Sequence, residues 1–221
     1  MLLLAGDVSD CLTLLITAFK ILRNRFKEII YLPGNHELWL WRDRENDSLA
    51  KFHLIEKITA DYGITMKPVQ LKTLSIVPLF GWYDYSFGRP SQFLKQIWVD
   101  YTACKWPSGY DEYHITRYFT SLNYNIRLSP SRDVISFSHF VPRIDLMPYY
   151  IEGHIRLLYP VLGSSILEKQ IRKLGSKIHV YGHSHINCSM LKDNTLYINN
   201  AFGYPNETAI ANKTLRCILE V

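Results

Sequence analysis

Residues 2–7 read LLLAGD, an apolar run followed by a glycine and a carboxylate. Four consecutive apolar residues predict a short buried strand, and the glycine allows a sharp turn directly after it. Related segments end at Asn35, at His139, and at His183 with His185. Because ligand sites in α/β proteins form beyond the carboxyl ends of strands, we expect these loops to converge.

Helix-like segments alternate with the strand-like ones, a pattern typical of an α/β fold. Apolar spacing and capping residues predict helices at 11–25, 48–62 and 166–174, the last of them with a capping box formed by Ser165 and Glu168. We expect further strands at 28–32, 69–85, 133–138, 177–181 and 215–221, and a hairpin at 189–199 that turns at Asp193 and Asn194. The chain is expected to form a single domain over residues 1–221.

The composition excludes several classes of protein. Apolar residues make up 48% of the 221 residues and charged residues 20%, which argues against disorder. No apolar run approaches the roughly 18 residues of a membrane helix, so we expect no membrane partner. The four cysteines lie far apart, as free thiols of a cytoplasmic protein would. The net charge of +5 includes no basic block, so there is no strong nucleic-acid signal.

Residues 84–130 form a segment of a different kind, crowded with aromatic side chains such as Trp98, Tyr101 and Trp106. One interpretation is an insertion that covers a site or contacts substrate. The other is that these rings fill a satellite core. Both stay open at this stage.

The residues that follow the strands point to transition-metal chemistry. Asp7, Asn35, His139, His183 and His185 offer a carboxylate, an amide oxygen and three imidazoles, a suitable shell for Mn, Fe or Zn. No cysteine falls in these loops, which argues against a structural zinc site. Each element alone is a weak signal, whereas the four elements in this order are a specific one.

In this combination the sequence resembles the calcineurin-like metallophosphoesterase superfamily. Its motifs are D-x-H, G-D-x-x-D, G-N-H-[ED], a strand-end histidine and G-H-x-H. Four of the five are present, at 6–10, 34–37, 139 and 182–185. The resemblance implies a sandwich of two mixed β-sheets flanked by helices, here lacking its first strand. It also implies two divalent metal ions.

The resemblance assigns a role to each matching residue. Asp7 is similar to the carboxylate that bridges two metal ions. The remaining protein ligands of one ion correspond to Asn35, His139 and His183, and His185 belongs to the other ion. His36 resembles the histidine that stabilises or protonates the leaving oxygen, with Asp10 as its orienting carboxylate. Glu37 is interpreted either as support for this site or as a surface ion pair, and His53, His114, His154 and His179 match no motif.

Two departures from the family pattern limit these assignments. No Asp-x-His occurs in the chain, so one ion has a full ligand set and the other keeps only Asp7 and His185. The simplest hypothesis is a truncated or mis-started two-metal enzyme; the alternatives are an impaired one-metal enzyme and a degenerate scaffold. In addition, Cys11 and Leu12 stand where Ser/Thr protein phosphatases have Arg-Gly, which argues against that activity.

The sequence therefore predicts a metal-dependent hydrolase of phosphate esters, either a phosphodiesterase or a phosphomonoesterase. A small phosphate ester is the expected substrate. Specificity is expected from the 84–130 segment and from the loop at 202–205. The rival hypothesis is a catalytically inactive scaffold that binds a protein partner.

Overall fold

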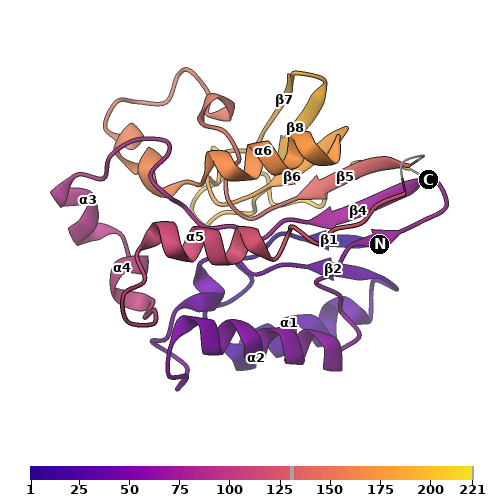
Figure 1. Ribbon diagram of the computed structural model, residues 1–221, viewed down its shortest axis with the longest axis horizontal. Helices are drawn as coiled ribbons and strands as arrows, with labels where there is room; N and C mark the ends of the chain where they lie inside the picture. The colour runs from indigo at the N-terminus through magenta and orange to yellow at the C-terminus, as the bar shows by residue number, and fades with distance from the viewer. Residues whose placement is uncertain (130–131, 221) are drawn as a thin grey trace.

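The computed structural model describes residues 1–129 and 132–220, whose strands form two sheets (Figure 1). In the smaller sheet β1 (Leu2–Leu4) pairs in parallel with β2 (Ile29–Tyr31). The larger sheet has the order β3-β4-β5-β6-β8-β7. Its strands are β3 (Val69–Gln70), β4 (Leu74–Pro78), β5 (Asp133–Phe137), β6 (Ile178–Tyr181), β7 (Cys188–Lys192) and β8 (Thr195–Asn199).

The predicted α/β class is confirmed, and the larger sheet is mixed as expected. Its inner strands β4, β5, β6 and β8 run in parallel, while β3 and β7 are antiparallel to their neighbours. The smaller sheet differs from the prediction of two mixed sheets, because its two described strands are parallel.

Helices lie beside both sheets (Figure 1). In this view α1 and α2 lie below the small sheet, and α6 lies above β5 and β6. The α-helices are α1 (Leu12–Arg23), α2 (Ser48–Asp61), α3 (Gln92–Ile97), α4 (Asp100–Ala103), α5 (Glu112–Ser121) and α6 (Ser165–Leu174); three short 3-10 helices are η1 (His36–Leu38), η2 (Ile144–Leu146) and η3 (Ile155–Val161). None of the described helices is both long enough and apolar enough to cross a lipid bilayer.

The alternation of side chains along β2 ties the layers together. Tyr31 packs edge-on against Phe19 of α1, with ring centroids 5.1 Å apart. Ile30, which points the other way, shares an apolar cluster with Ile76 of β4 and Phe137 of β5. Burial of both faces explains why β2 is a continuous apolar run rather than an alternating one. The strand therefore holds the small sheet between α1 and the large sheet.

Most predicted elements are present, and the exceptions have local causes. The segment 215–221 was predicted as a strand, but its described part contains none, and Val221 lies outside the described residues. Ile218 packs against the apolar cluster that contains Ile30 and Ile76, but Leu215 and Leu219 are exposed, so no continuous buried face forms in the described part of this segment. Strand structure predicted over 69–85 ends at Pro78. Helix α6 is capped by Ser164, which accepts from the Ile166 N–H, rather than by Ser165.

Candidate metal centre

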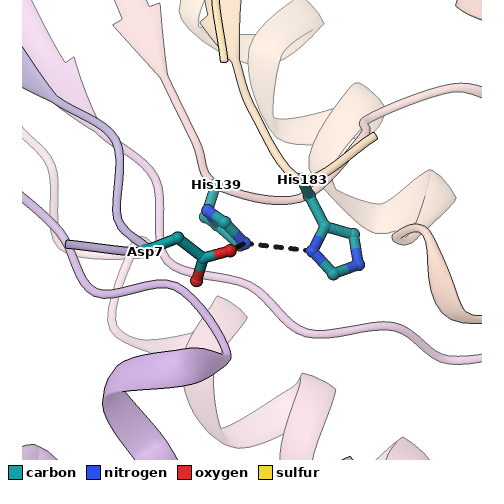
Figure 2. A group of neighbouring side chains, drawn as sticks. All are labelled: Asp7, His139 and His183. Atoms are coloured by element: carbon teal, nitrogen blue, oxygen red, sulfur yellow. Dashed lines mark hydrogen bonds and ion pairs between the residues drawn. The ribbon is translucent and has the colours of Figure 1, made fainter. Parts of the chain in front are cut away.

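Four loops that leave β1, β2, β5 and β6 meet at one point. They carry Asp7, Asn35, His139 and His183 respectively, and Figure 2 shows three of these side chains facing one another. The meeting of the two sheets is direct, because the His139 Nδ1 lies 2.8 Å from the carbonyl oxygen of Ala5. The structure thus brings together the four residues that the sequence assigned to one ion.

Two glycines allow the loops after β1 and β2 to approach so closely. A Cβ on Gly34 would lie 2.2 Å from Asp7 Oδ1, and a Cβ on Gly6 would lie 2.3 Å from the Gly34 nitrogen. A larger residue at Gly34 would displace the Asp7 carboxylate and the His139 ring, and one at Gly6 would displace backbone. The φ angles of Asp7 (55°) and His183 (61°) fall in the left-handed region, which non-glycine residues occupy at a cost of about 1–3 kcal/mol. Strain of this kind clusters at functional sites.

The ligand atoms surround a common space next to His139. Its Nε2 lies 3.0 Å from Asn35 Oδ1, 3.0 Å from His183 Nδ1 and 3.4 Å from Asp7 Oδ2. The ligand atoms of Asp7, His139 and His183 lie within 4.8 Å of one another. Asn35, His139 and His183 are buried, so water competes little for this space.

The position of the protons decides what this cluster can hold. His139 Nδ1–H donates to the carbonyl of Ala5, and His183 Nε2–H donates to the carbonyl of Val161 at 3.1 Å. Each imidazole therefore presents a lone pair on its other nitrogen, toward the amide oxygen of Asn35 and the carboxylate of Asp7. Four electron-pair donors face one another with no proton between them, which is the requirement of a cation site.

Electrostatics favours the same protonation states. Burial lowers the pKa of His139, and burial together with His139 lowers that of His183 well below its usual value. Burial opposes the charge on Asp7, but the neighbouring His139, His36 and His183 outweigh it and lower the pKa of this carboxyl. At neutral pH the site thus contains neutral imidazoles and an ionised carboxylate, the forms that bind metal ions.

Glu37 is a buried support of the site. Its carboxylate accepts hydrogen bonds from the backbone N–H groups of Gly34 (2.7 Å), Asp7 (2.9 Å), Val8 (2.5 Å) and Ser9 (3.2 Å). The side chain is fully buried, which excludes the surface ion pair as its interpretation. Burial, and then the charge of Asp7, raise its pKa to about 7. One carboxylate thus joins the loop of Asp7 to the loop of Asn35.

His36 lies beside this cluster, on the side open to solvent. Its ring stacks on Trp39, with centroids 3.8 Å apart, and its Nε2 lies 3.8 Å from Asp7 Oδ2 and 3.4 Å from the Tyr204 hydroxyl. Among the described residues, the carboxylate of Asp10 is paired with Arg42 at 3.1 Å and not with His36. The structure therefore holds His36 by contacts other than the one the sequence suggested.

His185 lies close enough to His139 and His183 to contribute to the lowering of the pKa of both imidazoles. Its Nδ1 lies 2.7 Å from Glu207 Oε2 and donates to that carboxylate, so in the neutral ring the lone pair lies on Nε2. Glu207 was missed in the sequence because it follows no strand and belongs to no motif. Its only signal would have been its place after the 202–205 loop.

Asp100 is a second residue that the sequence did not reveal. It lies in the aromatic segment and accepts a hydrogen bond from the side-chain amide of Asn35. In the same segment, Trp98 packs edge-on against His183, with ring centroids 5.8 Å apart, whereas Trp106 packs against the main hydrophobic core. The described part of the segment thus contributes both to the site and to the hydrophobic core, and residue 130 lies outside the described residues.

The four histidines that match no motif lie away from the cluster of ligand atoms. His179 is fully buried, whereas His53, His114 and His154 are exposed.

No protein-family model matches the sequence. The chain is 25% identical to the [Acyl-carrier-protein] phosphodiesterase PptH of Mycobacterium tuberculosis over 235 aligned positions, which cover 93% of this chain and 69% of that protein. The crystal structure of Phosphopantetheinyl Hydrolase (PptH) from Mycobacterium tuberculosis superimposes with a TM-score of 0.77 and 22% identity, covering 94% of this chain and 80% of that one. The chain shares the fold of PptH.

Proposed function

We propose that this chain is a metal-dependent phosphodiesterase. The observation that carries the proposal is the group of four electron-pair donors on Asp7, Asn35, His139 and His183, which have no proton between them. This set of oxygen and nitrogen donors suits Mn²⁺, Fe²⁺ or Zn²⁺. A bound ion of this kind lowers the pKa of water and polarises a phosphoryl oxygen.

We further infer that the fold is the metallophosphoesterase sandwich. Two observations support this: both sheets contribute to one apolar cluster, and the motif residues lie beyond the ends of their strands. We also propose that Asp7 and His185 would hold a second ion, since the contact with Glu207 uses only the Nδ1 of His185. The aromatic segment is proposed to cover the substrate, because Trp98 and Asp100 reach the metal ligands from it.

The chain's own residues have separate roles in the proposed reaction. The oxygen of a water molecule forms a bond to phosphorus and loses a proton to solvent, while the bond from phosphorus to the leaving ester oxygen breaks. The Nε2 of His36 faces the site and is proposed to donate a proton to that oxygen. Trp39 and Asp7 hold the ring in place for this transfer. The orienting role that the resemblance assigns to Asp10 stays a prediction, because its carboxylate is paired with Arg42 in the structure.

The proposed substrate is larger than the small phosphate ester that the sequence suggests. The relatives' names describe an acyl-carrier-protein phosphodiesterase and a phosphopantetheinyl hydrolase. We therefore propose a phosphodiester that joins phosphopantetheine to a carrier protein. Tyr204 supports this proposal, because its hydroxyl contacts His36 while the side chain remains about half exposed. A large substrate needs access of this kind.

The test is hydrolysis of a phosphopantetheinylated acyl carrier protein in the presence of Mn²⁺, followed by mass spectrometry of the carrier protein. We expect loss of one phosphopantetheine per carrier, abolished by Asp7→Asn and by His36→Ala and unchanged by Glu56→Gln, which alters an exposed side chain. An aryl phosphodiester assayed in parallel separates the chemistry from the substrate. Turnover of neither substrate, with less than one metal ion bound per chain, would instead support the scaffold.

A further inference from the structure

Asp100 occupies an unusual position for a charged side chain. It is 2% exposed, and both of its oxygens accept hydrogen bonds. Oδ1 accepts from the side-chain amide of Asn35 at 2.8 Å and from the indole N–H of Trp39 at 2.7 Å. Oδ2 accepts from the indole N–H of Trp98 at 2.8 Å. All three partners can only donate at these atoms, so the carboxylate satisfies three donors at once, of which the Asn35 amide is buried.

The contact with Asn35 decides which way its amide faces. A side-chain amide has an oxygen on one side and an NH₂ group on the other, and a flip exchanges them. A carboxylate can only accept, so the NH₂ group must face Asp100 and the oxygen must face His139, where it lies 3.0 Å from Nε2. In the flipped orientation, the NH₂ group would point at the proposed metal position and could not bind a cation.

The carboxylate of Asp100 also affects the position of His36, on the solvent-facing side of the site. Trp39 donates its indole N–H to Asp100 while the face of its ring stacks on His36. The position of the stacking ring is thus fixed by the acceptor that fixes Asn35. Asp100 lies more than 60 residues from both partners along the chain, so the aromatic segment sets the geometry of the loop after β2.

We propose that Asp100 is a positioning residue that makes Asn35 a metal ligand, and that it aligns His36 through Trp39. The proposal rests on the proposed metal-dependent function, because it requires a cation between Asn35 and His139. An asparagine at this position would have one acceptor oxygen for three donors. It would therefore leave Trp98 unpaired, or it would turn its own NH₂ group toward Asn35 and Trp39.

The matched variants are Asp100→Asn and Asp84→Asn. The first removes the charge and one acceptor at nearly constant volume. The second makes the same change at another buried carboxylate, which accepts from the Ser164 hydroxyl and the Ser86 N–H rather than from Asn35. Each purified protein is titrated with Co²⁺, and its visible absorption spectrum is recorded, since this spectrum reports the number and type of ligands. Thermal unfolding is measured without metal to show how far each variant is destabilised.

We expect Asp100→Asn to weaken Co²⁺ binding by about 10- to 100-fold, the usual effect of losing a residue that orients a ligand, and to change the spectrum of bound Co²⁺. Asp84→Asn should leave both unchanged, even if it lowers the unfolding temperature as much. If Asp100→Asn does not fold, Asp100→Glu keeps the charge but displaces the acceptor by a methylene, and it should give a smaller change in the same direction.

Three results would overturn the proposal, each in a different way. Wild-type protein that binds Co²⁺ while Asp100→Asn binds it equally well, with the same spectrum, would refute the role of Asp100 alone. Equal weakening by both variants would also assign Asp100 a purely structural role. Wild-type protein that binds no Co²⁺ would refute the metal site itself, and the role of Asp100 with it.

Discussion

The interaction of Glu37 with four backbone N–H groups gives a prediction whose size follows from the structure. In the variant Glu37→Gln, an NH₂ group replaces one oxygen. Oε1 accepts from Val8 and Ser9, and Oε2 accepts from Gly34 and Asp7. Whichever oxygen is replaced, two buried N–H donors then face a donor. An unsatisfied buried donor costs about 1–3 kcal/mol, so we expect a loss of about 2–6 kcal/mol.

Thermal unfolding of metal-free protein measures this loss. For a chain of this size, a loss of 1 kcal/mol in the free energy of unfolding lowers the thermal midpoint by about 2–4 °C. The lost hydrogen bonds alone should therefore lower the midpoint by at least about 4 °C. Removal of a buried charge offsets part of the loss, because burial already raises the pKa of Glu37 to about 7. Co²⁺ affinity should fall as well, since the loop of Asp7 loses its attachment to the loop of Asn35.

The control is Glu56→Gln, which makes the same chemical change on an exposed side chain of α2 and should move the midpoint by less than about 1 °C. A midpoint for Glu37→Gln within 2 °C of wild type would refute the reasoning. It would mean that the loops after β1 and β2 are held together without this carboxylate.

Three further predictions concern other parts of the site. Gly34→Ala should abolish Co²⁺ binding, because the added Cβ would lie 2.2 Å from Asp7 Oδ1, whereas Gly153→Ala, which meets nothing within 4 Å, should bind normally. Glu207→Ala should lower phosphodiesterase activity about 10- to 100-fold by freeing the His185 ring, with little change in the unfolding midpoint; unchanged activity would contradict this. Burial lowers the pKa of His179 to about 3, so the native state binds fewer protons than the unfolded state, and stability falls as pH drops below 6.5. Between pH 6.5 and 5.0, urea unfolding should show wild type losing about 2 kcal/mol more than His179→Gln, and equal losses would refute this.

The sequence predicted those parts of the fold that depend on local pattern. The hairpin of β7 and β8 turns at Asp193 and Asn194, both with positive φ, as their side chains favour. Strands β1, β2, β5 and β6 lie where apolar runs stop before a polar residue. The strand predicted at 215–221 is absent from its described part, because strand propensity depends on a surface to pack on, and here Ile218 packs against a neighbouring cluster while Leu215 and Leu219 stay exposed.

The candidate site shows more clearly what local sequence patterns can and cannot predict. The loops of Asp7, Asn35, His139 and His183 could be placed together from the topology rule alone, because each follows a strand. The residues that support them could not. Asp100 contacts Asn35 across 65 residues of sequence, and no periodicity or motif encodes that contact. The role of a supporting residue depends on the atom that it contacts, and that contact is formed only in the folded chain.

These supporting residues explain how the folded chain maintains a site whose geometry lowers the stability of the fold. Three site residues, Asp7, His183 and His185, adopt left-handed backbone conformations, and four lone pairs face one another in a buried space. Left alone, such a cluster would relax by rotating an amide or protonating an imidazole. The carbonyls of Ala5 and Val161 block a flip of each imidazole ring. A cation that binds only the folded chain returns stability in proportion to the logarithm of its concentration, about 2.7 kcal/mol at 100 times the dissociation constant. The geometry that makes the site unfavourable without a cation is therefore the geometry that makes it selective for one.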